Sequence, residues 1–166
     1  MTSHGWHRIA GALLIAALAH SHITAQQPAA LTNTAAKQTY VREKARLTRT
    51  AEAMPGEHYA FRLNSDSKPF AANLAAVTSL SARVCGEMTG RTNALASQDL
   101  QATLKSKTDV TPALAESFAL CDGYFDALPS STARVSATAE SLLDHYTSMA
   151  DFLAGHLRAK GIELPR

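Results

Sequence analysis

Histidines are the side chains of this chain best suited to hold a metal or carry a proton near neutral pH. Four of the seven fall within the first 22 residues, and the others are His58, His145 and His156. On a helix, His145 and Met149 would share one face and offer a soft nitrogen–sulfur pair to an ion such as Cu(I). Two ligands are too few for a stable site, and His156 would lie about 16 Å from His145 along the same helix. These residues alone therefore predict no metal centre.

The remaining polar groups near His145 have both functional and ordinary interpretations. His58 falls in a loop that would approach His145 only if it folded over the end of a bundle, and we expect it to be solvated. Asp144 and Asp151, seven residues apart around His145, could each supply an oxygen ligand, but we expect them to face water or pair with basic groups. For His145 itself we favour a structural role, with the imidazole hydrogen-bonded to a tyrosine or a carboxylate.

Two cysteines, Cys85 and Cys121, are the only ones in the chain. In an oxidising compartment they could form a disulfide, which requires Cα atoms about 4.4–6.8 Å apart. The alternative is a pair of small core residues, because free cysteine is among the most buried residue types. The sequence leaves both alternatives open.

Several chemistries lack their sequence signatures. The chain has no Ser-His-Asp order, no glycine-rich phosphate loop and no CxxC motif. Its 16 basic and 14 acidic residues nearly balance and form no basic stripe, so we expect no nucleic-acid partner.

The N-terminal segment has the pattern of a signal peptide, which we place at residues 1–25. Arg8 precedes an apolar run, 9–19, that is too short for a membrane-spanning helix, which takes about 20 residues. Ile23-Thr24-Ala25 offers a small-residue cleavage end. We expect a periplasmic or secreted protein that has no membrane segment after cleavage and has lost the four N-terminal histidines; the alternative is an uncleaved anchor. Residues 26–36 are predicted to be a flexible linker.

The rest of the chain, residues 37–166, predicts one all-α domain. Apolar residues recur every three or four positions in long segments with no strand pattern between them. Pro55-Gly56, Pro69, Gly90, Thr111-Pro112, Pro129 and Gly161 mark helix ends or starts. The four main helices are expected at 37–54, 68–88, 111–128 and 131–160, with a weaker short helix at 97–104. They imply a four-helix bundle, in which the long link before residue 111 could cross over one end.

Three stretches of this domain together resemble the DinB-like (YfiT-like) family of four-helix bundles. The segment 53–62 (AMPGEHYAFR) is similar to a turn of that family, 70–85 to its second helix, and 152–165 (FLAGHLRAKGIELP) to its closing motif. For members with an intact site, the resemblance implies three histidines that hold a divalent metal for hydrolase or thiol-transferase chemistry. One histidine would lie on the second helix and two, four residues apart, on the last. Three protein ligands leave a coordination position open for water or substrate.

This chain departs from that pattern at two of the three positions. Counting from Phe70, the second-helix ligand falls on Ala76, which cannot bind a metal. Counting back from Leu157, the pair on the last helix falls on His145 and Met149, so only His145 survives. No histidine lies anywhere from 59 to 144, so a shifted register would not restore the second-helix ligand.

The sequence therefore favours an exported, non-catalytic binding or interaction module with a degenerate metal site and no expected cofactor. The alternative is a metal-dependent hydrolase or thiol transferase with a reduced or unusual ligand set, which would bind a divalent metal. No specific partner follows from the residues, although the resemblance allows a homodimer.

Overall fold

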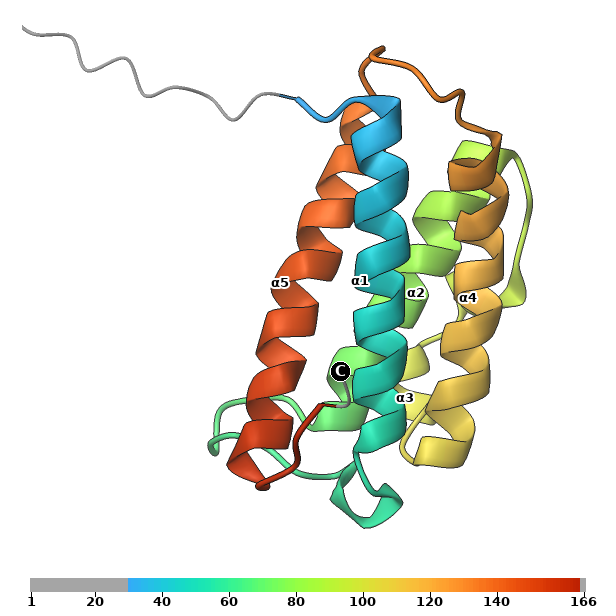
Figure 1. Ribbon diagram of the computed structural model, residues 1–166. Coiled ribbons are helices and arrows are strands. Elements are labelled where there is room, and N and C mark those ends of the chain that lie inside the picture. Colours follow the sequence, from blue (N-terminus) through green and yellow to red (C-terminus); the bar gives the residue numbers. More distant parts are fainter. Residues whose placement is uncertain (1–29, 165–166) are drawn as a thin grey trace, which may run out of the picture.

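The computed structural model describes residues 30–164, and this part of the chain is helical without a strand (Figure 1). Its elements are α1 (Asn33–Ala53), η1 (Gly56–His58), α2 (Phe70–Thr89), η2 (Ala94–Ser97), α3 (Leu100–Thr103), α4 (Lys107–Ala127) and α5 (Ala137–Ala159), where η denotes a 3-10 helix. The all-α prediction is confirmed for these residues. Within them, no helix has both the length and the apolar character needed to cross a membrane. The predicted signal peptide and residues 26–29 of the predicted linker lie outside the described residues.

The first helix begins earlier than its apolar pattern indicates. The Thr32 hydroxyl accepts the Ala35 backbone N–H and caps α1, so residues 33–36, expected in the linker, form its first turn. The backbone before the helix pairs with the α4–α5 connection, because Val135 N–H donates to the Leu31 carbonyl at 2.9 Å. This pairing orders a segment whose composition alone indicates a loose tail.

The starts of the last two long helices also differ from expectation. Ser106 caps α4 in a reciprocal capping box with Asp109, so the helix begins at Lys107 rather than at Thr111. The Thr111 hydroxyl instead donates to the Lys107 carbonyl at 2.8 Å, and Pro112 lies inside the helix. Ser136 caps α5, so residues 131–136 belong to the connection rather than to the helix.

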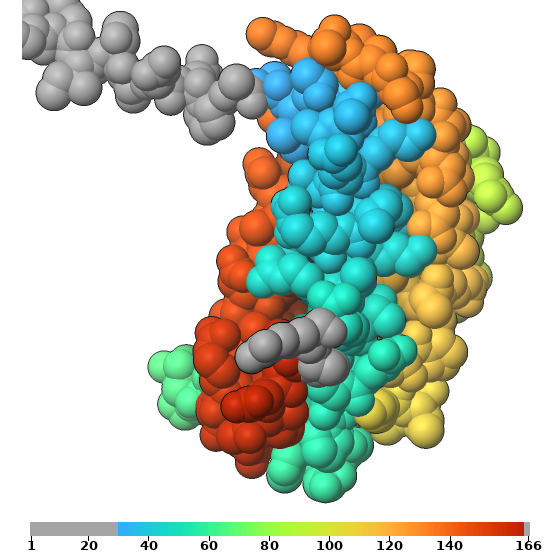
Figure 2. Space-filling model, in the orientation of Figure 1, coloured from blue at the N-terminus to red at the C-terminus, as the bar shows by residue number. Residues whose placement is uncertain are grey.

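The four long helices form a bundle in which helices adjacent in sequence are not always adjacent in space. Figures 1 and 2 show α1 on one face with α4 and α5 on either side of it, and Figure 1 shows α2 behind. Lys37 Nζ donates to the Leu128 carbonyl and Lys107 Nζ to the Met54 carbonyl, so α1 and α4 are antiparallel. Ser81 contacts Tyr146, which together with the end contacts described below makes α2 and α5 antiparallel.

Helices α1 and α5 are parallel, because their starts are joined by the Leu31–Val135 hydrogen bond and Arg46 pairs with Asp151 further along. It follows that α2 and α4 run parallel, and residues 90–106 must return along the bundle between them. The link that the sequence left open is therefore a crossover, but it returns along the bundle rather than over one end, and it contains η2 and the short helix α3. It starts with a tight turn: Gly90 has φ of 66°, and a Cβ on Gly86 would lie 2.8 Å from the Arg91 carbonyl oxygen. Glycine at 86 lets the crossover pass directly over α2.

The core is built from aromatic and aliphatic side chains of all four long helices. Tyr40 and Phe125 stack with ring centroids 4.2 Å apart, and Phe118 meets Tyr146 edge to face at 5.7 Å. Each of these side chains is essentially removed from solvent. The aromatic layer fixes the spacing between helices, and with it the positions of the polar groups described next.

Candidate functional site

A cleft of about 520 Å³ between α2 and the first half of α5 is the strongest candidate site. Its volume falls in the range of small-molecule pockets, about 300–1,000 Å³. It is lined by Leu80, Arg83, Val84, Ala137, Thr138, Ser141, Leu142 and His145. The cleft therefore combines an apolar wall with one guanidinium, two hydroxyls and one imidazole.

His145 is the single residue of the three family positions that could do chemistry, and it lies in this cleft. Neither of its ring nitrogens hydrogen-bonds to any group in residues 30–164, and Nε2 is shielded from solvent. The expected hydrogen bond to a tyrosine or carboxylate is therefore wrong: the neighbouring Tyr146 hydroxyl pairs with Ser81 at 2.6 Å instead. Burial lowers the pKa of His145, which favours a neutral imidazole at pH 7.

Of the other two family positions, Ala76 lies at a different level of the bundle from His145, and Met149 lies one turn further along α5. Tyr146 contacts Ser81, and Ala76 lies five residues before Ser81. Ala76 is therefore displaced by about 9 Å along the bundle axis from the level of His145. Met149 shares the helix face of His145 and lies about 6 Å along the axis from it. His145 and Met149 thus have the i, i+4 spacing at which two side chains can share a ligand, but the α2 position does not lie level with His145.

Arg83 is the group in the cleft that sequence reasoning missed. It is exposed, and within residues 30–164 its guanidinium has no hydrogen-bond or ion-pair partner. The Thr138 and Ser141 hydroxyls also make no hydrogen bond to the described part of the chain. No signal in the sequence predicts that Arg83 lies near His145, because their proximity depends on which face of α2 packs beside α5.

His156 occupies a different environment at the opposite end of α5. It is fully buried among three phenylalanine rings, with centroids 4.9 Å from Phe152, 5.6 Å from Phe70 and 6.0 Å from Phe61. Nδ1 lies 3.3 Å from the Phe152 carbonyl oxygen, while Nε2 has no partner within the described residues. Burial lowers the pKa of His156. This is an apolar cage around a neutral imidazole.

The remaining polar residues near His145 in sequence do not reach it in space. His58 lies in η1, just past the end of α1, far from the first half of α5. Asp151 forms an ion pair with Arg46 of α1, as expected for a carboxylate beside a basic group, and Asp144 is exposed. Within residues 30–164, no group of three His, Cys, Asp or Glu side chains is arranged to hold a metal ion.

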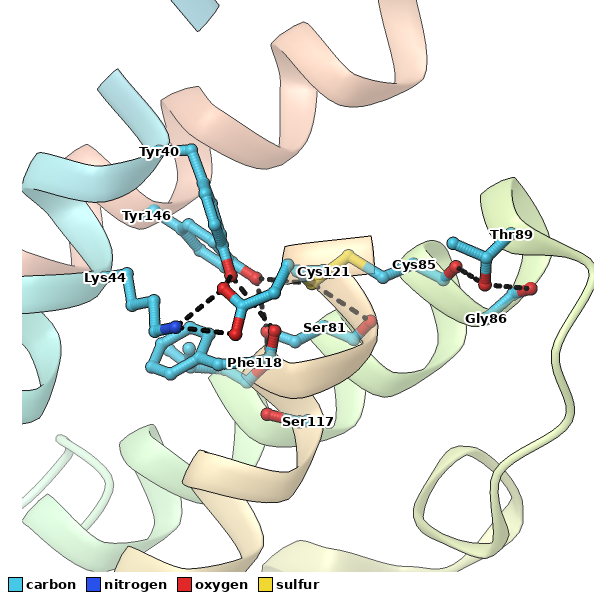
Figure 3. The surroundings of a disulfide bond; sticks show 12 residues. Tyr40, Lys44, Ser81, Cys85, Gly86, Thr89, Ser117, Phe118, Cys121 and Tyr146 are labelled. Atoms are coloured by element: carbon cyan, nitrogen blue, oxygen red, sulfur yellow. Dashed lines mark hydrogen bonds and ion pairs between the residues drawn. A yellow bond between two sulfur atoms is a disulfide. The ribbon is translucent and has the colours of Figure 1, made fainter. Parts of the chain in front are cut away.

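Cys85 of α2 and Cys121 of α4 form a disulfide, with an S–S distance of 1.98 Å and Cα atoms 4.9 Å apart (Figure 3). Both residues are fully buried. The Tyr146 hydroxyl lies 3.4 Å from Cys121 Sγ and 2.6 Å from the Ser81 hydroxyl, so α2, α4 and α5 meet at this point. Of the two alternatives that the sequence left open for the cysteines, the structure has the disulfide.

A second polar cluster, in which Tyr40 is buried while Lys44 and Asp122 are partly exposed, lies on the α1 side of the disulfide, as Figure 3 also shows. The Tyr40 hydroxyl donates to Asp122 at 2.7 Å, and Lys44 Nζ contacts both carboxylate oxygens of Asp122 at 2.6 and 2.7 Å. Burial, reinforced by the Asp122 carboxylate, raises the pKa of Tyr40 strongly. All polar groups here are satisfied by one another, which indicates a structural link between α1 and α4 rather than a reactive centre.

Comparison with known proteins adds no family assignment. No family model matches the sequence, and no curated protein matches it.

Proposed function

We propose that this protein is an exported helical-bundle module of the DinB-like type that binds a small molecule in the cleft between α2 and α5, and that it catalyses no metal-dependent reaction. The observation that carries the proposal is the cleft itself, in which His145 and Arg83 have no partner within the described residues. Unpaired polar groups on an apolar wall are the usual composition of a ligand site.

The DinB-like assignment is supported by where the three family-like stretches lie. Phe61 belongs to the first stretch, Phe70 to the second, and His156 to the third. The rings of both phenylalanines pack against the His156 ring, and Phe70 also meets Tyr59 at 5.2 Å. The third stretch, distant in sequence from the other two, thus joins them in one contact cluster at one end of the bundle, which is what a shared fold motif would require.

The non-catalytic part of the proposal rests on ligand chemistry. Alanine at 76 has no donor atom, and methionine at 149 is a poor ligand for the divalent ions that activate water. Metal analysis of the untagged chain tests this point. We expect less than stoichiometric zinc, nickel, iron and manganese; one tightly held ion per chain that is lost in His145→Ala would refute the proposal and favour the hydrolase or transferase alternative.

Binding in the cleft can be tested with three six-carbon probes, namely hexanoate, hexanol and hexylamine. We expect at least one of them to shift the amide NMR signals of Ser141 and Leu142, and Ser141→Trp to abolish the shift at Leu142 by filling the cleft. Ser148→Trp is the matched control, because Ser148 is exposed on the same helix and does not line the cleft. If no probe perturbs these signals, the cleft is not a binding site.

Export can be tested separately from binding. We expect the chain produced with its native N-terminus in a bacterial host to appear in the periplasm or medium and to begin at Gln26, following cleavage after Ala25. An intact N-terminus in the membrane fraction would instead support the uncleaved anchor.

A further inference from the structure

We infer that the ligand of the α2–α5 cleft is a small carboxylate with an apolar tail, held through the Arg83 guanidinium. This inference rests on the proposed binding function and specifies its ligand class. It follows from the side chains that line the cleft and from their lack of internal partners.

Arg83 gives the cleft its charge. A guanidinium is always protonated and presents a planar fork of donors that matches a carboxylate. Some basic side chains of the described residues are already engaged by carboxylates: Lys44 binds Asp122, and Arg46 binds Glu43 and Asp151. Arg83 has no such partner among the described residues, and no carboxylate lines the cleft with it. A single free guanidinium matches the charge of one carboxylate.

The neighbouring polar groups favour an anion as well. Thr138 and Ser141 each present a hydroxyl that can donate to a carboxylate oxygen. Ala137 and Thr138 are the first two residues of α5, so this end of the cleft also lies at the positive end of a helix dipole. These features add to the effect of Arg83 and all favour the same charge.

The apolar wall sets the other half of the ligand. Leu80 and Val84 of α2 face Leu142 of α5 across the cleft, and Val84 and Leu142 are buried at its floor. Along α5, the lining residues extend from Ala137 to His145, about 12 Å. That length accommodates a short alkyl chain beside the anionic head, whereas a bare inorganic anion would leave the wall uncovered.

His145 provides an internal reporter of the bound charge. Arg83 is the only other charged or titratable side chain among the described residues that line the cleft. A carboxylate placed beside both would raise the pKa of His145 by favouring the imidazolium, whereas an alcohol of the same length would not.

The test compares hexanoate, hexanol and hexylamine on the purified chain by NMR titration, following Ser141, Leu142 and the His145 ring. We expect hexanoate to bind most tightly, and we expect Arg83→Gln to weaken it about tenfold or more, since a charged hydrogen bond is lost. Arg49→Gln is the matched control because Arg49 is exposed on α1, lines no part of this cleft and has no hydrogen-bond partner among residues 30–164. Its affinity for hexanoate should equal that of the unaltered chain.

Two results separate this inference from the proposed function. The carboxylate inference is overturned, while the binding function stands, if the three probes bind the cleft equally. The same holds if Arg83→Gln changes neither the affinity for hexanoate nor the rise that hexanoate causes in the pKa of His145. If none of the probes binds, both fail. Arg83→Gln should keep the thermal midpoint of the unaltered chain, since Arg83 makes no bond that holds the described fold together, so misfolding would not obscure the comparison.

Discussion

Breaking the disulfide between Cys85 and Cys121 should lower the free energy of unfolding by several kcal/mol. The cross-link closes a loop across a sequence separation of 36 residues and joins two helices that run parallel. In the chain-entropy description, closing such a loop removes about 13 cal/mol/K from the unfolded chain, or about 3.8 kcal/mol at 25 °C. This is a large share of the stability of a domain of this size, which is typically about 5–15 kcal/mol.

The assay is urea unfolding of the oxidised and the reduced chain, followed by far-ultraviolet circular dichroism. Both cysteines are fully buried, so reduction is carried out in urea and followed by refolding in the presence of the reductant. With an unfolding slope of about 2 kcal/mol/M, the midpoint should fall by about 2 M urea. The reduced chain keeps both sulfur atoms, so no side-chain volume is removed, although the two thiols must move apart from their bonded distance of 1.98 Å.

A double variant, Cys85→Ala with Cys121→Ala, provides the second measurement. It should lose more stability than reduction alone, because it also leaves small cavities beside Tyr146. If reduction changes the unfolding free energy by less than about 1 kcal/mol, the entropic reasoning is refuted, because an effect that small is far below the value for a loop of this length.

Three further predictions concern other parts of the bundle. Because burial lowers the pKa of His156, protonation of this imidazole opposes folding. The free energy of unfolding should be flat above pH 7 and should fall as the pH drops below about 6.5. In His156→Leu the fall below about pH 6.5 should be less steep. Glu43 is 1% exposed and binds Arg42 and Arg46. Glu43→Gln should therefore lower the free energy of unfolding, measured in urea, by about 2 kcal/mol. An unchanged free energy of unfolding would show that these two ion pairs contribute nothing to stability. Gly86→Ala should destabilise the fold by about 1–3 kcal/mol, since the new Cβ would lie 2.8 Å from a backbone oxygen. The helical control Gly155→Ala, whose nearest contact would be at 3.8 Å, should stabilise the fold by up to about 1 kcal/mol. Equal thermal midpoints for the two variants would contradict this account.

The helices could be predicted from the spacing of apolar residues, but their starting points could not. Thr111-Pro112 has the local pattern of a helix start, yet the Ser106–Asp109 capping box lies one turn upstream and satisfies more backbone groups. Lys107 then donates to carbonyls at the end of α1, a tertiary contact that favours the earlier start. Local patterns cannot rank two competing caps when a distant helix contributes to the choice.

The candidate site was less predictable than the fold. The family resemblance directed attention to His145, and the structure does place it in a cleft. Arg83 could not be foreseen, because it lies on a different helix and its relation to His145 depends on how α2 and α5 face each other. The disulfide stayed open for the same reason: the distance between Cys85 and Cys121 depends on the crossover that makes α2 and α4 parallel.

The diagonal placement of α1 and α2 has a consequence for the order in which the chain can fold. The first two long helices to leave the ribosome pack chiefly on α4 and α5 rather than on each other. A nascent chain that ends before residue 107 therefore has no partner for most of the apolar face of α1, and native docking must wait for the C-terminal half. The described core therefore forms late in synthesis, when the last two long helices are available to cover the first two.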